Sequence, residues 1–568
     1  MSLHKIFTVL SIGSYFAMLT NCNDAAQDVG QKEELQQQDL TDLVYPQLDT
    51  ENSRWFFFSS ASRPFGMVNL SPDTKLNGTW GSGYRHEIDT VKGFSHIHGW
   101  QLSGLSVMPV TTTKESEHKI FTDFYSKFDH VKEKVSPGYH ALELERYGIE
   151  AELTSTTRVG FHKYTYPKND KEKAILFNLN ALLGPCETKQ GKLRQLNDST
   201  LIGEFIIAPT SRRPKPNPVF FQVELNTPLT SLYQDKATGN YLMKLENKGL
   251  PVLMKIGISY TSQKNAKLNL DTELPEWDFN EVVKESKAEW NGLLNRIVVD
   301  GATDIDKRRF YTDLWHALLG RKIISDINGA YPDNTGLQFR IGQLPLKENG
   351  KPAFNHYNSD AFWGAQWTIN TLWGLVYPEI KKEFLQSLIQ YEKDGGKIPR
   401  GPSGGNYTFV MTGASSTPFI VSAIQQGIVK DSLEKIYEKL KKNHMAGGIM
   451  EKAGYEHTTN LGGGLDYYMN KGYVPHPNPK GKFGLHQDGA SLTMEYAYQD
   501  FVLAQLAKKL GFKKDYDYFL KRSNNYKNVF DTASGWMRPK NVTGNWKEDF
   551  DPYLYENGFN ESNGAQST

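Results

Sequence analysis

Hydrophobic side chains recur with two different periods on the two sides of Pro275. From about residue 45 to 275 the apolar runs are short, rich in β-branched and aromatic residues, and often separated by Pro, Gly, Asn or Asp. Beyond Pro275, as in 279–294 and 306–319, apolar residues recur at i, i+3 and i+4. The first pattern favours strands and the second favours helices. The chain therefore predicts an antiparallel β-sandwich over 45–275 and a helical domain over 276–568.

Several helices of the second half have readable ends. Pro378 suits the first position of a helix over 379–391, and Asp431–Glu434 reads as a capping box opening a helix to about Lys442. The strongest pattern, 491–510, stops at Gly511 and precedes a hairpin partner over 515–530. About eight helices are readable, which favours stacked αα-hairpins in a helical toroid.

The N-terminal residues predict export. Lys5 precedes a mostly apolar segment too short to span a bilayer, and residues 19–22, LTNC, resemble a bacterial lipobox. We expect a lipoprotein signal peptide over 1–22, lipidation of Cys22, a polar tether over 23–44 and anchoring to the bacterial cell envelope; ordinary secretion is the alternative. Cys186 would then be alone in the mature chain, which excludes an intrachain disulfide and a zinc–thiolate site.

Overall charge bounds the partners. The 568 residues include 65 basic and 64 acidic side chains, a net charge of +1. A nucleic-acid-binding chain normally carries a strong basic excess, so we expect no nucleic acid as a partner.

A short motif in the first half places two histidines together. Residues 64–74, PFGMVNLSPDT, read as a strand and turn, and residues 93–98, GFSHIH, follow. In a strand, His96 and His98 point to the same face. Aromatic residues nearby, including Trp80, favour a pocket for a polyhydroxylated ligand bound by Trp80, His96 and His98. The alternative is that both histidines are structural.

These two segments resemble glycoside hydrolase family 92, the calcium-dependent α-mannosidases, whose N-terminal domain carries PFGM-x-x-LSPDT and GFSH-x-H-x-SG. Further markers follow in the same order along the chain: GYVP at 472–475, the 492–510 helix with EYAYQD at 495–500, GWMRP at 535–539 and FDP at 550–552. The resemblance implies a β-sandwich packed on an (α/α)6 barrel, with the active site at their junction.

The resemblance also implies a function. Members remove α-linked mannose from glycans by an exo-acting, inverting, calcium-assisted mechanism, and α-1,2 linkages are the expected substrate. Residues 561–566, ESNGAQ, resemble the E-x-N-x-x-Q segment whose glutamate is the general acid, here Glu561. The family segments associated with calcium and with the base are expected beyond Glu561. We therefore expect a toroid cut short at its C-terminal end, and the base and the metal ligands stay unassigned.

One family segment departs from its pattern. WDTFR, which contacts the sugar, aligns with residues 363–367, WGAQW, so Gly364 replaces its aspartate and Trp367 its arginine. Asp360 and Arg400 lie near in sequence and are candidates to grip sugar hydroxyls instead, although either also suits a structural ion pair. The departure leaves two alternatives open, a catalytically inactive carbohydrate-binding lipoprotein and an inverting glycoside phosphorylase.

Overall fold

The computed structural model of the chain describes residues 38–51, 59–78, 82–169, 171–246, 249–358, 361–454, 461–479 and 488–568. Contacts divide the chain into Met1–Asp39 and Leu40–Thr568, and the fold below is that of the second unit. The predicted signal peptide, Cys22 and most of the tether lie outside the described residues. No helix in the described ranges is long and apolar enough to cross a membrane.

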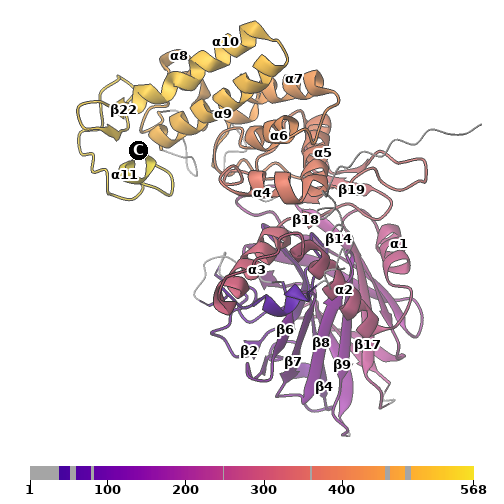
Figure 1. The fold of residues 1–568 in the computed structure, drawn as a ribbon. Helices are drawn as coiled ribbons and strands as arrows, with labels where there is room; N and C mark the ends of the chain where they lie inside the picture. The colour runs from indigo at the N-terminus through magenta and orange to yellow at the C-terminus, as the bar shows by residue number, and fades with distance from the viewer. Residues whose placement is uncertain are drawn as a thin grey trace, which may run out of the picture. The chain divides into compact units, whose positions relative to one another are not determined.

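Two antiparallel sheets form the sandwich (Figure 1). The six-stranded sheet has the order β1 (Ser71–Pro72), β3 (Phe94–Gly99), β4 (Leu102–Thr112), β10 (Glu172–Asn178), β16 (Tyr241–Leu245) and β15 (Leu229–Gln234). The nine-stranded sheet has the order β11 (Leu182–Leu183), β12 (Cys186–Gln195), β13 (Thr200–Ile207), β14 (Asn217–Leu225), β17 (Val252–Ser259), β9 (Val159–Thr165), β8 (Ile149–Ser155), β7 (Tyr139–Leu144) and β6 (Lys134–Ser136).

Alternation of side chains explains how the two sheets share a core. Along β13 every second residue is buried, from Leu201 to Ile207, because successive side chains of a strand point to opposite faces. Those buried residues join one apolar cluster with residues of both sheets, such as Phe177 of β10. The predicted β-sandwich is confirmed.

Four short two-stranded sheets complete the β structure. They pair β2 (Thr90–Val91) with β5 (Ser126–Lys127), β18 (Lys322–Ile323) with β21 (Tyr357–Asn358), β19 (Ala330–Asp333) with β20 (Arg340–Gln343), and β22 (Phe530–Asp531) with β23 (Trp536–Met537).

Three helices follow the sandwich strands. The sequence did not predict α1 (Gln263–Glu273), which packs on β17 at Gly257, where a Cβ atom would lie 2.7 Å from Leu270 Cβ. The predicted helix α2 (Phe279–Leu294) is confirmed, with the Asp278 side chain accepting from the Glu281 N–H. Helix α3 (Asp304–Leu319) begins two residues before its predicted start.

The remaining helices build the second domain. They are α4 (Ile369–Val376), α5 (Pro378–Gly395), α6 (Ser416–Gln425), α7 (Leu433–Asn443), α8 (Leu465–Lys471), α9 (Gly489–Lys509), α10 (Lys513–Arg522) and the short α11 (Gly564–Ser567), with 3₁₀ turns at Leu40–Leu43, Glu117–Lys119, Ile449–Glu451 and Ser523–Val529. Helices α4 to α7, α10 and the C-terminal half of α9 share one apolar core that includes Trp373 and Phe419, and α8 packs in a second cluster with the N-terminal half of α9. A sandwich followed by a helical domain is therefore the observed fold, as predicted, and the domain boundary at residue 275 stays a prediction.

Two local predictions in the helical half were wrong. The predicted helix is present as α7, which begins directly after Ser432, but the capping box is not formed. Ser432 has φ 57°, and its side chain accepts no hydrogen bond from a backbone N–H of the helix. The helix predicted to run to Phe530 ends at Arg522 and tightens into the 3₁₀ turn Ser523–Val529.

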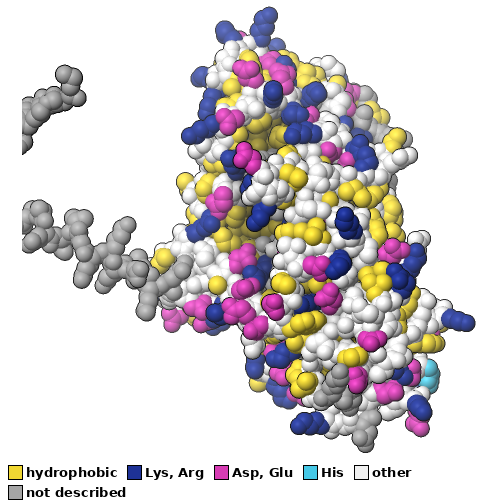
Figure 2. Space-filling view, turned by 90° about the vertical axis from the view of Figure 1, so that its right-hand side faces the viewer, with side chains coloured by type: hydrophobic (Ala, Val, Ile, Leu, Met, Phe, Trp, Pro, Cys, Tyr) yellow, Lys and Arg dark blue, Asp and Glu magenta, His cyan; other side chains and the backbone are white. Residues whose placement is uncertain are grey.

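The turn at residues 64–66 joins the sandwich to the helices. Phe65, with φ 54°, lies edge-on to Tyr357, Trp373 and Phe384 at centroid distances of 5.7–6.2 Å. A second contact comes from Asn217 of β14, whose side-chain amide donates to the Gly404 carbonyl at 2.7 Å. On the face shown in Figure 2, basic and acidic side chains are interspersed, in keeping with the balanced total charge.

Candidate active site

A pocket of about 760 Å³ opens beside the N-terminal half of α9. Its walls come from four stretches of chain: residues 363–367, residues 411–412, residues 488–498 and residues 560–567. Its lining includes three carboxylates, Asp488, Glu495 and Glu561, and two indole rings, Trp363 and Trp367. Carboxyl groups beside aromatic faces are the side chains that a sugar-processing pocket requires.

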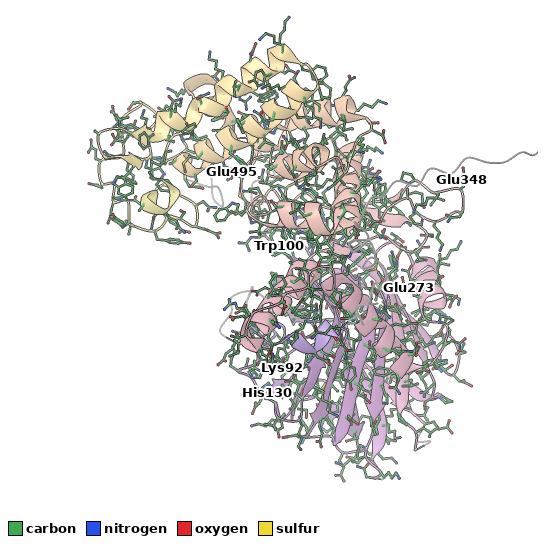
Figure 3. All side chains as sticks on the ribbon, in the orientation of Figure 1. Lys92, Trp100, His130, Glu273, Glu348 and Glu495 are labelled. Atoms are coloured by element: carbon green, nitrogen blue, oxygen red, sulfur yellow. The ribbon has the colours of Figure 1, made fainter. Side chains whose placement is uncertain are left out.

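Glu495 is a pocket carboxyl whose pKa is raised. It lies on the second turn of α9 and lines the pocket; Figure 3 labels it in the helical domain. Burial raises its pKa to about 7, and a hydrogen bond from Gln499 only partly offsets that effect. Gln499 Nε2 donates to Glu495 Oε1 at 2.5 Å, one helical turn away. Near neutral pH, Glu495 can therefore both hold and release a proton.

Gln499 is held in one orientation by the backbone. Its Oε1 accepts the Ala414 N–H at 2.6 Å, which leaves its NH₂ group as the donor toward Glu495. Gln499 is fully buried and its bond to Ala414 is buried, whereas its bond to Glu495 is partly buried at the pocket wall. This arrangement fixes which oxygen of Glu495 faces the amide.

Glu561, the predicted general acid, lines the same pocket. It is exposed and has φ 52°, in a turn that follows Asn560. The Asn560 N–H donates to Ser491 Oγ of α9 at 3.0 Å, which ties this segment to the helix that carries Glu495. The structure thus brings Glu561 and Glu495 to one cavity, although they are far apart in sequence.

The segment that departs from the family pattern also lines the pocket. Trp363 lies edge-on to Trp100 of the β3–β4 turn, with ring centroids 5.9 Å apart. Trp367 is 81% exposed, so its ring is available to a ligand. The motif that ends in GFSHIHGW therefore supports the pocket through Trp100 and not through its histidines.

His96 and His98 are buried, and neither is among the described residues that line the pocket. The His98 ring bonds Asn69 O at 2.7 Å and Asp73 Oδ1 at 2.8 Å. His96 Nδ1 donates to the Leu105 carbonyl at 2.9 Å. Both ring nitrogens of His98 bond buried partners, which favours the structural alternative, and the substrate role of the pair stays a prediction.

The second nitrogen of His96 completes a buried chain. Its Nε2 lies 2.9 Å from His162 Nε2, and His162 Nδ1 lies 2.7 Å from the Tyr164 hydroxyl. Burial lowers the pKa of His96 to about 4, so the ring is neutral. Because Leu105 O can only accept, His96 Nε2 must accept from His162, whose Nδ1 then accepts from Tyr164.

Arg400 is likewise buried. Its guanidinium donates five hydrogen bonds, all to main-chain carbonyls: those of Phe409, Val410, Gly413, Ile449 and Lys452, at 2.7–3.2 Å. The side chain is 1% exposed, and burial lowers its pKa to about 10, which leaves it charged at neutral pH. All five guanidinium N–H donors bond the protein's own carbonyls, which favours a structural role, and the sugar-binding role of Arg400 stays a prediction. The other two predicted ligands, Trp80 and Asp360, lie outside the described residues.

Comparison with protein-family models shows which family the chain belongs to. The glycosyl hydrolase family 92 N-terminal domain matches residues 43–270, and the catalytic domain of the same family matches residues 265–568. The chain belongs to glycosyl hydrolase family 92. The family assignment predicted from the two motifs is confirmed.

Individual relatives support the same fold. The family GH92 α-mannosidase BT3965 from Bacteroides thetaiotaomicron is 28% identical, with a TM-score of 0.78 over 93% of this chain and 71% of that one. The GH92 inverting mannosidase BT2199 from the same organism is 22% identical, with a TM-score of 0.78 over 92% and 70%. An uncharacterized secreted glycosidase of Arthroderma benhamiae is 23% identical over 560 residues, and the chain spans 65% of its length.

Family 92 implies calcium, an ion that binds through oxygen ligands. The pocket's carboxylate and amide oxygens are donors that calcium prefers. Within the described ranges, however, the groups that bring three His, Cys, Asp or Glu ligand atoms within 4.8 Å of one another lie elsewhere: His86, His130 and Glu133, and Asp49, Asp313 and His316. The described residues therefore do not assign the calcium ligands.

The sequence placed Glu495 on the correct helix without giving it a role. The signal was a carboxylate inside a mostly apolar helix, one residue before the buried Tyr496. Its raised pKa depends on burial by segments distant in sequence, which no local pattern contains.

Proposed function

We propose that this family 92 member is an exo-acting glycoside hydrolase that removes α-linked mannose, α-1,2-linked in particular, from glycans by an inverting mechanism. Family membership and the α-mannosidase BT3965 among its structural relatives support the reaction class. The observation that carries the proposal is one pocket whose lining includes Glu561, Glu495 and two tryptophan side chains, Trp363 and Trp367.

Glu561 is the proposed general acid. In glycoside hydrolysis one carboxylic acid protonates the leaving oxygen, and in inverting enzymes a second carboxylate activates water on the opposite face. Because the pKa of Glu495 is raised to about 7, Glu495 is the described pocket carboxyl best suited to exchange a proton at neutral pH. We propose it as the partner of Glu561 in proton transfer.

Leaving-group dependence tests these roles. A dinitrophenyl leaving group departs without protonation, so Glu561→Gln should lose turnover of an α-1,2-mannobioside by about 100-fold or more and retain most turnover of dinitrophenyl α-mannoside. Glu495→Gln should lose both. The exposed Glu556 lies five residues before Glu561, so Glu556→Gln is the matched control.

The stereochemistry and the alternative have their own outcomes. NMR of the first product should show β-mannose, and α-mannose would refute inversion. Mannan binding by calorimetry without any turnover of mannobiosides would replace the enzyme with a carbohydrate-binding protein. Turnover that requires phosphate would point to a phosphorylase instead.

Calcium dependence and export complete the proposal. Calcium can grip the vicinal hydroxyls of a mannose ring, so a chelator should abolish turnover and added Ca²⁺ should restore it. For export, the secreted relative of A. benhamiae gives support, and the LTNC segment favours a lipid anchor on Cys22. Labelling with a radioactive fatty acid should mark the wild-type chain and not Cys22→Ala.

A further inference from the structure

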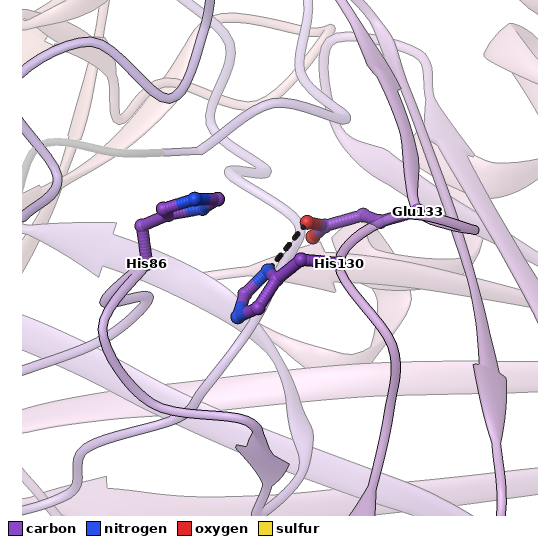
Figure 4. A group of neighbouring side chains, drawn as sticks. All are labelled: His86, His130 and Glu133. Carbon is purple, nitrogen blue, oxygen red and sulfur yellow. Dashed lines mark hydrogen bonds and ion pairs between the residues drawn. The ribbon is translucent and has the colours of Figure 1, made fainter.

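Two histidines and a glutamate converge in the sandwich domain, in a group that contributes nothing to the pocket lining. His86 lies in the turn before β2, and His130 and Glu133 lie in the connection between β5 and β6. Each offers one ligand atom, and the three atoms lie within 4.8 Å of one another. Figure 4 shows the three side chains converging, and Figure 3 shows His130 and Glu495 on different domains.

The Tyr84 hydroxyl lies at short range from all three. Its oxygen is 3.4 Å from His86 Nδ1, 3.5 Å from His130 Nδ1 and 2.8 Å from Glu133 Oε2. His130 Nδ1 is 3.0 Å from the same Glu133 oxygen. Four ligands at about 2.0–2.1 Å from a tetrahedral ion are separated by roughly 3.3–3.5 Å. The separations among Tyr84, His130 and Glu133, and that from Tyr84 to His86, are 2.8–3.5 Å and approach this value, while the His86 ligand atom lies within 4.8 Å of those of His130 and Glu133.

A second layer of side chains holds the carboxylate in place. Glu133 Oε1 accepts from His140 Nε2 at 2.7 Å, and His140 Nδ1 lies 2.7 Å from Ser60 Oγ. Burial by itself would raise the pKa of Glu133, but His140, His130 and Tyr84 lower it to about 2, so the group is an anion at neutral pH. Outer partners of this kind orient metal ligands in known sites.

We propose that His86, His130 and Glu133 bind one divalent first-row transition ion of the Zn²⁺ class, with the Tyr84 hydroxyl at the fourth corner. Two imidazoles with one carboxylate suit such an ion, whereas Ca²⁺ and Mg²⁺ prefer oxygen ligands alone. The ion takes the place of the proton that His130 Nδ1 shares with Glu133.

The role of this ion is structural. Its ligands come from the two segments that flank the β2–β5 pair, in which Val91 faces Ser126. A bound ion would cross-link those segments and stabilise the folded state by mass action.

Zn²⁺ binding to the untagged full chain tests the proposal. After dialysis against a chelator, calorimetry with Zn²⁺ in excess Ca²⁺ should show one tight site, and Zn²⁺ should raise the thermal midpoint. Co²⁺ should give the strong visible absorption of a tetrahedral complex. In His86→Ala and Glu133→Gln the affinity should fall by about 100-fold or more.

His118→Ala is the matched control, because His118 is an exposed histidine of the same domain outside this cluster. It should bind Zn²⁺ as the wild type does. The proposal is refuted if the wild type binds no Zn²⁺ and gives no tetrahedral Co²⁺ spectrum, or if His86→Ala binds Zn²⁺ as tightly as His118→Ala. Since these residues lie outside the pocket lining, glycosidase activity should not follow Zn²⁺ occupancy.

Discussion

Replacing Arg400 by lysine separates a structural role from a sugar-binding role. The guanidinium donates five hydrogen bonds to main-chain carbonyls in a fully buried position. A lysine ammonium offers only three N–H donors, so Arg400→Lys loses at least two of these bonds. At about 1.5–3 kcal/mol for each bond to a charged donor, the free energy of unfolding should fall by about 3–6 kcal/mol.

Thermal unfolding measures that loss. At about 2 °C per kcal/mol for a large domain, the midpoint should fall by about 6–12 °C. Arg309, which is 73% exposed, gives the matched control, and Arg309→Lys should leave the midpoint unchanged. The substitution should also weaken sugar binding, because Met411 and Thr412 of the pocket wall lie between the carbonyls of Phe409 and Gly413 that Arg400 holds.

The opposite result would support the sequence-based interpretation. If Arg400→Lys keeps the wild-type midpoint while mannoside affinity collapses, then the guanidinium contacts substrate and the structural reasoning fails. Urea unfolding at neutral pH, followed by circular dichroism, gives an independent estimate of the same free energy.

Three further predictions follow from buried groups. Burial lowers the pKa of His96 to about 4, below the value of about 6.5 in the unfolded chain. The free energy of unfolding that depends on the neutral ring is therefore fully present above pH 6.5 and falls by about 3 kcal/mol as the pH falls toward 4. A urea midpoint unchanged between pH 7 and 4.5 would contradict this. Gln499→Leu removes the hydrogen bond that favours ionised Glu495, so the pKa of Glu495 should rise above about 7 and the acidic limb of the pH profile of kcat/KM, which reports the base, should move to higher pH; an unmoved limb would show that this profile does not report Glu495. Gly404→Ala places a Cβ atom 2.4 Å from a side-chain oxygen of β14, whereas Gly350→Ala, also at positive φ, meets nothing within 4 Å. The first substitution should lower the free energy of unfolding by about 2 kcal/mol more than the second. Equal losses would refute the steric reasoning.

Sequence reasoning succeeded where the determinant was local. The period of apolar residues located α2 and α9, because burial of one face imposes that period wherever the chain later packs. It failed at α1, a polar helix that is recognised only when it meets the surface of β17. It failed again at Ser432, since the capping signal specifies residue types and not the φ of 57° that the preceding loop imposes.

The candidate site divides in the same way. The family motifs led to Glu561, and the pocket contains it. The motifs could not show that every N–H of the Arg400 guanidinium donates to a main-chain carbonyl, as far as 52 residues away. Nor could they show that the His98 ring is hydrogen-bonded to Asp73. A side chain's role depends on which partners surround it, and those partners are distant in sequence.

The amino-acid sequence by itself determined the two-domain class, the family and one member of the active-site pocket, because periodicity and motif order are properties of neighbouring residues. Tertiary structure alone decided that Glu495 joins Glu561 and that the predicted histidine pair belongs to the core. It also brought His86 to His130 and Glu133. The physical reason is that burial and proximity set the pKa of a group and its free hydrogen-bonding capacity, and both arise only when distant segments pack together.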